Sequence, residues 1–238
     1  MILISGDNLV DWVNSAKSFT PRRLLPKIDN FMRKPKVDKI GILFGLRMTG
    51  KSIILRHAAM QLNQLDKSLA IIVEKNDFYS DIDKIIKDFY STGINNFFID
   101  DFTLMKDYEN YDVNLIDYYL VNNIHILIAG THSLGFSILN QNEWYQKCHF
   151  FQTTYIPFSE WSMLSKYNSI DEYLRYGGIL STMDNANKFY IKKETFRFIT
   201  SHSIGSYVDT AICDNIVHVI KHNDNNDWRN VILKDIQK

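Results

Sequence analysis

Four residues of the sequence follow the spacing of a loop that binds phosphate through its backbone. Gly45, Gly50, Lys51 and Ser52 satisfy the pattern G-x-x-x-x-G-K-S/T without any adjustment. In such a loop the glycines let backbone N–H groups approach an anion, and the N-terminus of the following helix adds its positive dipole end. We expect the Lys51 ammonium to reach the β and γ phosphates of a nucleotide, and the Ser52 hydroxyl to take one position around Mg²⁺.

The rest of the loop and the residue after it complete the predicted nucleotide site. We assign nucleotide binding to Gly45, Arg47, Met48, Thr49, Gly50, Lys51, Ser52 and Ile53. At average residue frequencies, a chain of this length matches the pattern by accident about once in a hundred sequences. The alternative is a glycine-rich turn before a helix, with Lys51 merely solvated. The flanking elements decide between the two.

A pair of acidic residues, Asp100 and Asp101, follows the apolar run Phe97–Ile99. Ligands of open α/β sheets gather at the carboxyl ends of such strands. Asp100 is predicted to hold Mg²⁺ through water, because Mg²⁺ prefers one or two carboxylates and keeps several of its waters. Asp101 is predicted to orient or polarise the attacking water. The alternative is an N-cap pair at a strand-to-helix turn.

A polar group also ends a later apolar run, 125–133, which closes with Gly-Thr-His-Ser. The hydroxyl of Thr131 can donate a hydrogen bond to the γ phosphate or to the attacking water. His132 is the second choice, because a lone histidine at this position is more often a surface residue than a catalyst. The predicted catalytic residues are therefore Lys51, Asp101 and Thr131.

The segments on either side of the glycine loop have the pattern that a phosphate loop requires. Residues 38–44 form a short apolar run, which predicts a buried strand leading into the loop. After the loop, apolar residues recur at spacings of three and four, which predicts a helix: Ile54, Leu55, Ala58, Ala59 and Leu62. The context of strand, loop and helix is therefore present.

Further apolar runs alternate with amphipathic helices along the chain. Strands are predicted at 68–77, 95–102, 125–133 and 148–158, and helices at 81–90 and 114–123. This alternation predicts an α/β fold of the P-loop NTPase class, a parallel sheet with helices on both faces. From about Ser159 the pattern becomes helical. We expect a P-loop ATPase domain over 1–158 and a small helical lid subdomain over 159–238, whose last part can also be read as the start of a truncated further domain.

The strand at 68–77 lies in the sequence between the loop strand and the acidic strand. It favours the branch of ATPases in which an extra strand separates the phosphate-loop strand from the acidic (Walker B) strand. A GTP-binding protein needs an N-K-x-D motif after the acidic strand. The nearest string, 74–77, precedes that strand and lacks the asparagine. The sequence therefore predicts ATP rather than GTP.

Composition limits the function classes. The chain of 238 residues is 45% hydrophobic and 23% charged, the ordinary balance of a soluble globular protein. Its 27 basic and 27 acidic residues cancel, which argues against a protein that mainly coats nucleic acid. One segment, 19–39, holds seven basic and two acidic residues. It is read as a contact for nucleic acid, as a frame for adenine, or as a solvated basic helix.

The sequence predicts an intracellular setting. Cys148 and Cys213 lie far apart without metal-ligand spacing, so we expect reduced thiols. No apolar run is long enough to span a membrane. The opening segment lacks the basic lead-in and long apolar region of a signal peptide, so we expect a cytoplasmic protein with no membrane partner.

Taken together, these motifs resemble a known family, the archaeal and bacterial AAA+-like ATPases related to STAND and MoxR-like proteins. GLRMTGKSIIL, residues 45–55, is similar to that family's phosphate loop, G-x-R-x-x-G-K-S/T-x-x-L. Other similar segments are the basic segment 21–23, the Walker B strand 96–101, the sensor strand 128–131, the Pro-φ-Ser-x-x-Glu segment 156–160 and the Tyr-Leu-x-x-Gly-Gly segment 173–179. The resemblance covers residues 20–180.

The resemblance implies an ATPase that uses Mg²⁺ and switches conformation for a DNA or protein partner, with a homo-oligomer allowed. Arg175, Arg197 or a neighbouring subunit are candidates for an arginine finger. Asp101 stands where the family more often has Glu, and Leu180 replaces an expected Pro. Many members also carry a nuclease-like domain that this chain is too short to hold whole. The open alternatives are a P-loop kinase and a nucleotide-gated DNA- or protein-binding module with negligible hydrolysis.

Overall fold

A computed structural model describes residues 1–46, 48–105, 113–131, 142–164 and 170. All of them belong to the first of the chain's two units, Met1–Asp184. The predicted lid subdomain falls almost entirely outside the described residues, and the predicted boundary between 158 and 159 stays a prediction.

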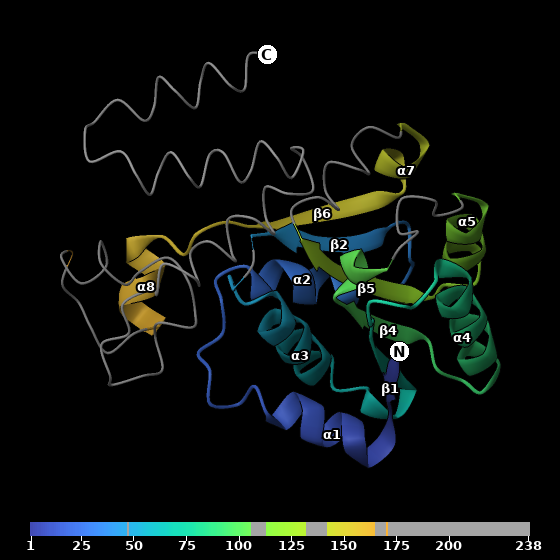
Figure 1. Cartoon of the computed structure of the whole chain (residues 1–238), viewed down its shortest axis with the longest axis horizontal. Coiled ribbons are helices and arrows are strands. Elements are labelled where there is room, and N and C mark those ends of the chain that lie inside the picture. Colours follow the sequence, from blue (N-terminus) through green and yellow to red (C-terminus); the bar gives the residue numbers. More distant parts are fainter. Residues whose placement is uncertain (47, 106–112, 132–141, 165–169, 171–238) are drawn as a thin grey trace. The chain divides into compact units, whose positions relative to one another are not determined.

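A six-stranded sheet forms the centre of the described part (Figure 1). Its strands are β1 (Ile2–Ile4), β2 (Ile40–Gly45), β3 (Ser68–Ile72), β4 (Asn96–Asp100), β5 (His125–Thr131) and β6 (Cys148–Thr153). Their order across the sheet is β1-β3-β4-β5-β2-β6, and every neighbouring pair is parallel except β1 with β3. β5 therefore separates the loop strand β2 from the acidic strand β4, as in the branch of ATPases that the sequence favoured. The strand on which that expectation rested, β3, lies instead on the other side of β4.

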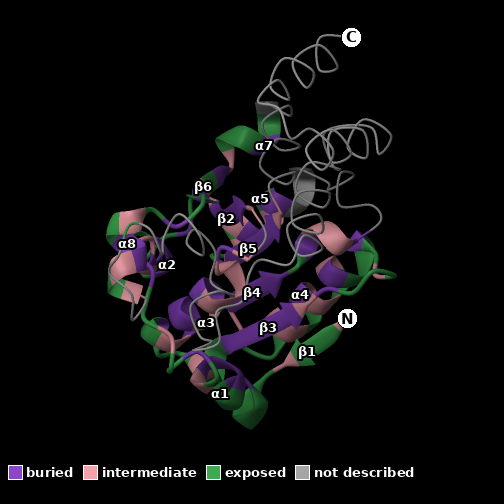
Figure 2. Ribbon diagram, turned by 60° about the vertical axis from the view of Figure 1, so that its left-hand side comes forward, coloured by how far each residue is buried: buried purple, intermediate pink, exposed green. Residues whose placement is uncertain are grey.

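The central strands are apolar throughout because helices cover both faces of the sheet. Every residue of β2 and of β4 is buried (Figure 2). On one face lie α1 (Gly6–Asn14), α2 (Leu25–Met32) and α3 (Lys51–Leu62). On the other lie α4 (Tyr79–Ser91), α5 (Val113–Val121) and α7 (Asn142–Gln146). The predicted α/β fold with two helical layers is confirmed.

Side chains that alternate along each strand separate the core into two layers. Leu43, Phe98 and Leu127 face α1, α2 and α3. Their strand neighbours Ile42 and Ile99 face α4, α5 and α7. This two-sided burial fixes the register of the strands and so fixes where their carboxyl ends lie, because a shift by one residue would exchange the two faces.

Short elements connect and complete these layers. The 3₁₀ helices η1 (Leu65–Lys67) and η2 (Phe102–Leu104) follow α3 and β4, and α8 (Phe158–Leu164) follows β6. Cys148 begins β6 and is buried, and burial raises the pKa of its thiol to about 12. Cys213 lies outside the described residues. Among the described helices, none combines the length and the apolar character needed to cross a membrane.

Candidate nucleotide-binding site

The predicted phosphate loop joins β2 to α3, and glycine is required at both of its ends. Gly45 has φ of 148°, and a Cβ atom there would lie 1.9 Å from the carbonyl oxygen of Thr153 on β6. Gly50 has φ of 91° and is the residue before the first turn of α3. Both conformations are ones that side chains disfavour. Met48 also has a positive φ, 62°, so the loop turns sharply between its two glycines.

Side chains hold the carbonyl oxygens of the loop. The Lys51 ammonium donates to the carbonyl oxygens of Gly45, at 3.0 Å, and Leu46, at 2.6 Å. The Thr49 hydroxyl lies 2.7 Å from the Leu46 carbonyl oxygen and 2.9 Å from the Thr153 hydroxyl. Side chains of the loop and of the first turn of α3 therefore occupy these carbonyl oxygens.

Ser52 and Asp100 meet at the site. Ser52 lies in the first turn of α3 and Asp100 at the end of β4, close enough for the Ser52 hydroxyl to lower the pKa of the Asp100 carboxyl. Asp100 is 5% exposed. Burial and the neighbouring charge of Asp101 raise the pKa of Asp100, whereas the Ser52 hydroxyl, the Asp101 backbone N–H and the charge of Arg56 act in the opposite direction. The two predicted metal ligands therefore lie near each other, although they are 48 positions apart in the sequence.

This pair of groups fits Mg²⁺. A hydroxyl and a carboxylate are the hard oxygen ligands that Mg²⁺ prefers, and the ion normally keeps waters and phosphate oxygens in its other positions. A buried carboxylate whose pKa is raised by burial is stabilised by a nearby cation. Ser52 and Asp100 would hold the ion.

Asp101 is exposed and occupies the left-handed region, with φ of 56°. Its backbone N–H donates to Asp100 Oδ1 at 2.9 Å, and its carbonyl accepts from the Leu104 N–H at 2.8 Å. Within the described residues, the Asp101 carboxylate makes no capping hydrogen bond to η2. The backbone rather than the side chain therefore organises this turn, which argues against the capping alternative and leaves the carboxylate at the surface of the site.

Thr131 lies beside the start of the loop. In the sheet, Gly45 pairs with Thr131 on β5 and with Thr153 on β6, so the two threonines flank it. The Thr131 N–H and hydroxyl both lie within hydrogen-bond distance of the Thr103 hydroxyl, at 3.2 and 3.1 Å. Thr103 follows the acidic pair and was not predicted as a site residue. It connects the end of β4 to the predicted sensor on β5.

Several predicted residues cannot be placed. Arg47 of the loop, the reserve candidate His132, and both arginine-finger candidates, Arg175 and Arg197, lie outside the described residues. The remaining loop residue, Ile53, is in the first turn of α3. The structure therefore brings together Lys51, Ser52, Asp100, Asp101 and Thr131 with the loop backbone, and the roles assigned to them stay predictions.

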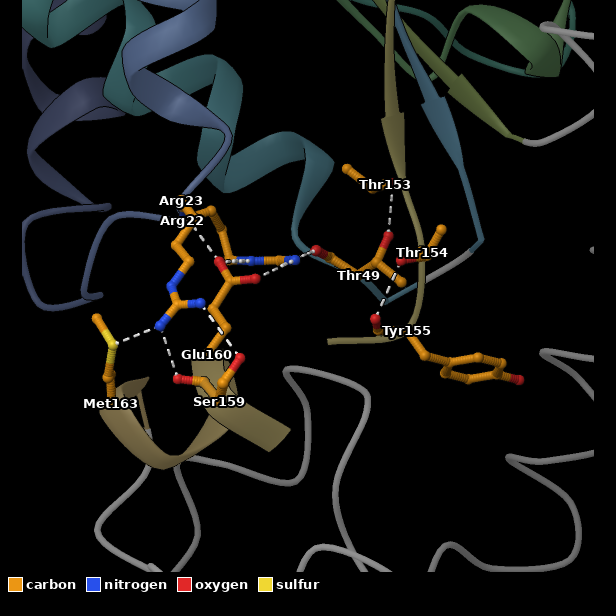
Figure 3. A network of polar contacts seen from close by, with 9 residues as sticks. All are labelled: Arg22, Arg23, Thr49, Thr153, Thr154, Tyr155, Ser159, Glu160 and Met163. Atoms are coloured by element: carbon orange, nitrogen blue, oxygen red, sulfur yellow. Dashed lines mark hydrogen bonds and ion pairs between the residues drawn. The ribbon is translucent and has the colours of Figure 1, made fainter. Parts of the chain in front are cut away.

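A buried ion pair next to the loop was not predicted. Arg22 precedes α2, and its guanidinium contacts Glu160 on α8 and the carbonyl oxygen of Thr49 (Figure 3). Arg22 and Glu160 belong to two of the segments on which the family resemblance rests, 21–23 and 156–160. The resemblance points to the two segments separately, and nothing in the sequence pairs them. The basic segment is therefore not simply a solvated helix.

No protein-family model and no curated protein matches the chain. Among solved structures it is similar to Hsp104 of S. cerevisiae in complex with ADP, with a TM-score of 0.47 and 12% identity over 90% of this chain and 37% of that one. It is similar to C. elegans PCH-2, with a TM-score of 0.35 and 14% identity over 98% and 69%. It is also similar to katanin, with a TM-score of 0.34 and 16% identity over 93% of this chain and 73% of that one. These three neighbours are AAA+ ATPases.

The class of the protein follows from its own strand order and site. A parallel sheet in which β5 separates β2 from β4, a glycine loop between β2 and α3, and the contact of Ser52 with Asp100 define an α/β fold of the P-loop NTPase kind. The narrower resemblance to STAND-related ATPases, with or without a nuclease-like domain, stays a prediction.

Proposed function

We propose that the protein binds Mg-ATP, hydrolyses it slowly and uses the change to switch conformation for a partner. The observation that supports this best is the proximity of the Ser52 hydroxyl to the buried Asp100 carboxylate, whose pKa it lowers. It brings the phosphate-loop helix and the acidic strand together at one edge of the sheet, although β2 and β4 are not neighbours. A glycine-rich turn without function would not require a buried carboxylate at this position.

The residues have distinct roles in the proposal. Phosphoryl transfer depends mainly on positioning and on stabilising charge. The loop N–H groups and Lys51 bind the phosphates, and Ser52 and Asp100 hold Mg²⁺, which supplies charge neutralisation at the phosphate oxygens when it is bound. Thr131 contacts the γ phosphate or the attacking water, and Asp101 orients that water. We expect slow turnover because aspartate has a shorter reach to the water than the glutamate that is commoner at this position.

The first experiment is binding of Mg-ATP to the purified chain and to Lys51→Ala, measured by calorimetry. We expect Lys51→Ala to bind at least about tenfold more weakly, because the loss of a charged hydrogen-bond donor typically has an effect of this size. Lys87→Ala is the control, since Lys87 lies on α4 and pairs with Asp83 at its own surface. Equal affinity of Lys51→Ala and the parent would refute the loop assignment.

The second experiment separates the alternatives. Phosphate release is measured with and without DNA, and GTP competes against labelled ATP. Release of phosphate supports the ATPase. Tight ATP binding without release until a partner is added supports the nucleotide-gated module, and transfer of phosphate to another molecule supports a kinase. We expect GTP to compete poorly, because the N-K-x-D motif is missing from the sequence.

The setting of the protein is part of the proposal. We place it in the cytoplasm, with a DNA or protein partner and with self-association in the presence of ATP. Sedimentation of the chain with and without Mg-ATP tests the last point. A single unchanged species over a wide range of protein concentration would argue against a homo-oligomer.

A further inference from the structure

Arg22 forms a buried, two-point ion pair with a residue far along the chain. Its Nε lies 2.7 Å from Glu160 Oε1 and its Nη2 lies 3.2 Å from Glu160 Oε2. The Arg23 backbone N–H donates to the same Oε1 at 2.8 Å. The side chains of Arg22 and Glu160 are 6% and 7% exposed. The carboxylate is therefore held from three directions, and the pair joins the segment before α2 to α8 (Figure 3).

The third nitrogen of the same guanidinium reaches the phosphate loop. Arg22 Nη1 donates to the carbonyl oxygen of Thr49, the residue directly before Gly50. In a trans peptide the carbonyl and the following N–H point in opposite directions in one plane. Fixing the Thr49 carbonyl therefore also fixes the direction of the Gly50 N–H, which is one of the groups that a phosphate loop offers to its anion.

The chemistry of the Arg22–Glu160 ion pair suits a role in positioning the loop better than a role in stabilising the fold. A buried ion pair contributes little beyond what well-packed apolar side chains of similar size would contribute. The planar fork of arginine can, however, serve both carboxylate oxygens and a third acceptor at once. Neither lysine nor an apolar residue can make this set of contacts, so the pair performs a task that core packing cannot.

We propose that Arg22 is a positioning residue for the phosphate loop, and that Glu160, by holding Arg22, makes nucleotide affinity depend on how α8 packs. The effect on affinity rests on the proposed function, the binding of Mg-ATP. α8 follows β6 directly and begins the part of the chain that was predicted to act as a lid. A displacement of α8 would release the Arg22 guanidinium and with it the Thr49–Gly50 peptide.

The principal variant replaces both members of the ion pair, Arg22→Met with Glu160→Leu, so that no buried charge is left without its partner. We expect this double variant to stay folded and to bind Mg-ATP about tenfold more weakly or worse, measured by calorimetry with melting temperatures alongside. The control is Arg33→Met. Arg33 also holds a carboxylate, Asp29, and a carbonyl oxygen of α3, that of Gln61, at the opposite end of the helix.

A second pair of variants applies if the double variant does not fold. Arg22→Lys keeps the charge but loses the fork, and Glu160→Gln keeps a carbonyl oxygen for Arg22 but loses the charge. We expect both to weaken ATP binding, Arg22→Lys more strongly. Parental affinity in a folded double variant, or in both of these conservative variants, would overturn the proposal, because a purely structural ion pair would change melting temperature without changing affinity.

Backbone hydrogen exchange without nucleotide separates this inference from the proposed function. Loss of Arg22 should speed exchange of the loop amides at residues 48–52, whereas Arg33→Met should leave them unchanged. If the parent failed to bind Mg-ATP, the proposed function would be refuted, and unchanged loop exchange in the Arg22 variants would independently refute the positioning role. Faster exchange without a loss of affinity in a parent that binds ATP would also overturn the inference.

Discussion

The position of Asp100 favours two different charge states of its carboxyl group. A cation site requires the ionised form, whereas burial favours the neutral form. Asp100 must be charged to attract a cation, yet it is buried beside a second acid, and both conditions raise its pKa. The Ser52 hydroxyl lowers this pKa but compensates only in part. The native pKa therefore lies above that of the unfolded chain, and the folded protein is less stable wherever this group has to be ionised.

We expect Asp100→Asn to melt higher than the parent at pH 7 while binding Mg-ATP more weakly. Asparagine keeps an acceptor for the Ser52 hydroxyl and removes the buried charge, so a gain of about 1 kcal/mol, or about 2–4 °C, is reasonable. As pH falls through the raised native pKa, the native Asp100 takes up a proton before the unfolded chain does. The advantage of asparagine should therefore disappear by the ordinary Asp value of 3.8. A lower melting temperature at pH 7 would contradict this account.

The neighbouring acid, Asp101, should behave differently. We expect Asp101→Asn to melt no lower than the parent, because asparagine tolerates a φ of 56° as well as aspartate does and the substitution removes a charge that disfavours ionised Asp100. It should keep the parental ATP affinity and lower the rate of phosphate release. Asp101→Glu should keep or raise turnover through its longer reach, with some loss of stability in this left-handed conformation. Steady-state phosphate release and calorimetry measure both effects. Parental turnover in Asp101→Asn would remove Asp101 from the mechanism.

At the scale of elements, the sequence predicts β2, β4 and β5 well, because strands buried on both faces leave continuous apolar runs. It predicts β3 and β6 too long. β3 ends at Ile72 and β6 at Thr153, whereas Val73 and Ile156 are buried beyond those ends. Burial continues after strand pairing has stopped, and an apolar pattern reports burial rather than pairing.

Other elements were missed because their signals are short. β1 has three residues, too few for a period to be visible, and it exists because it pairs with β3 at the edge of the sheet. α1 buries Leu9, Trp12 and Val13 at helical spacing, but a helix of nine residues repeats this spacing hardly more than twice. The Arg22–Glu160 contact is different, since no local pattern joins residues that lie 138 positions apart.

The junction of β2 with the loop gives a prediction at this scale. Gly45→Ala should destabilise the protein by more than about 2 kcal/mol, because the added methyl would lie 1.9 Å from the backbone of β6 and would push two paired strands apart. Gly93→Ala is the control. Gly93 also has a positive φ, 98°, but no atom lies within 4 Å of its added Cβ among the described residues, so only the backbone term of about 1 kcal/mol applies. Urea unfolding of both variants tests this, and equal losses would contradict it.

On the scale of the whole molecule, the pH dependence of stability reports the long-range ion pair. Burial alone would raise the pKa of Glu160, but the hydrogen bonds from Arg22 and the Arg23 N–H, with the charges of both arginines, hold it below its ordinary value. The stabilisation is therefore fully present above the unfolded value, about 4.5, and is lost as pH falls through the lower native pKa.

We expect the difference in unfolding free energy between the parent and Glu160→Gln to be constant from pH 7 to about pH 5 and to shrink only below about pH 4.5. Urea unfolding across this range measures it. Asp29→Asn serves as a control for an exposed pair, Asp29 with Arg33, and should give a small difference at every pH. A parental advantage that already fades between pH 7 and 5 would contradict the direction assigned to Glu160.

The order of the strands has a consequence for how the protein is made. β2 is synthesised early, but its two neighbours in the sheet, β5 and β6, emerge from the ribosome about 80 and 100 residues later. Gly45 can pair with Thr131 and Thr153 only after each of these strands has been synthesised. The contact of Arg22 with Glu160 forms later still, because the two residues lie 138 positions apart. A nascent chain halted before β6 carries the whole predicted phosphate-binding motif and still lacks Thr153 and Glu160. The proposed nucleotide site therefore takes its final shape only after synthesis has passed Glu160, long after its sequence motif is complete.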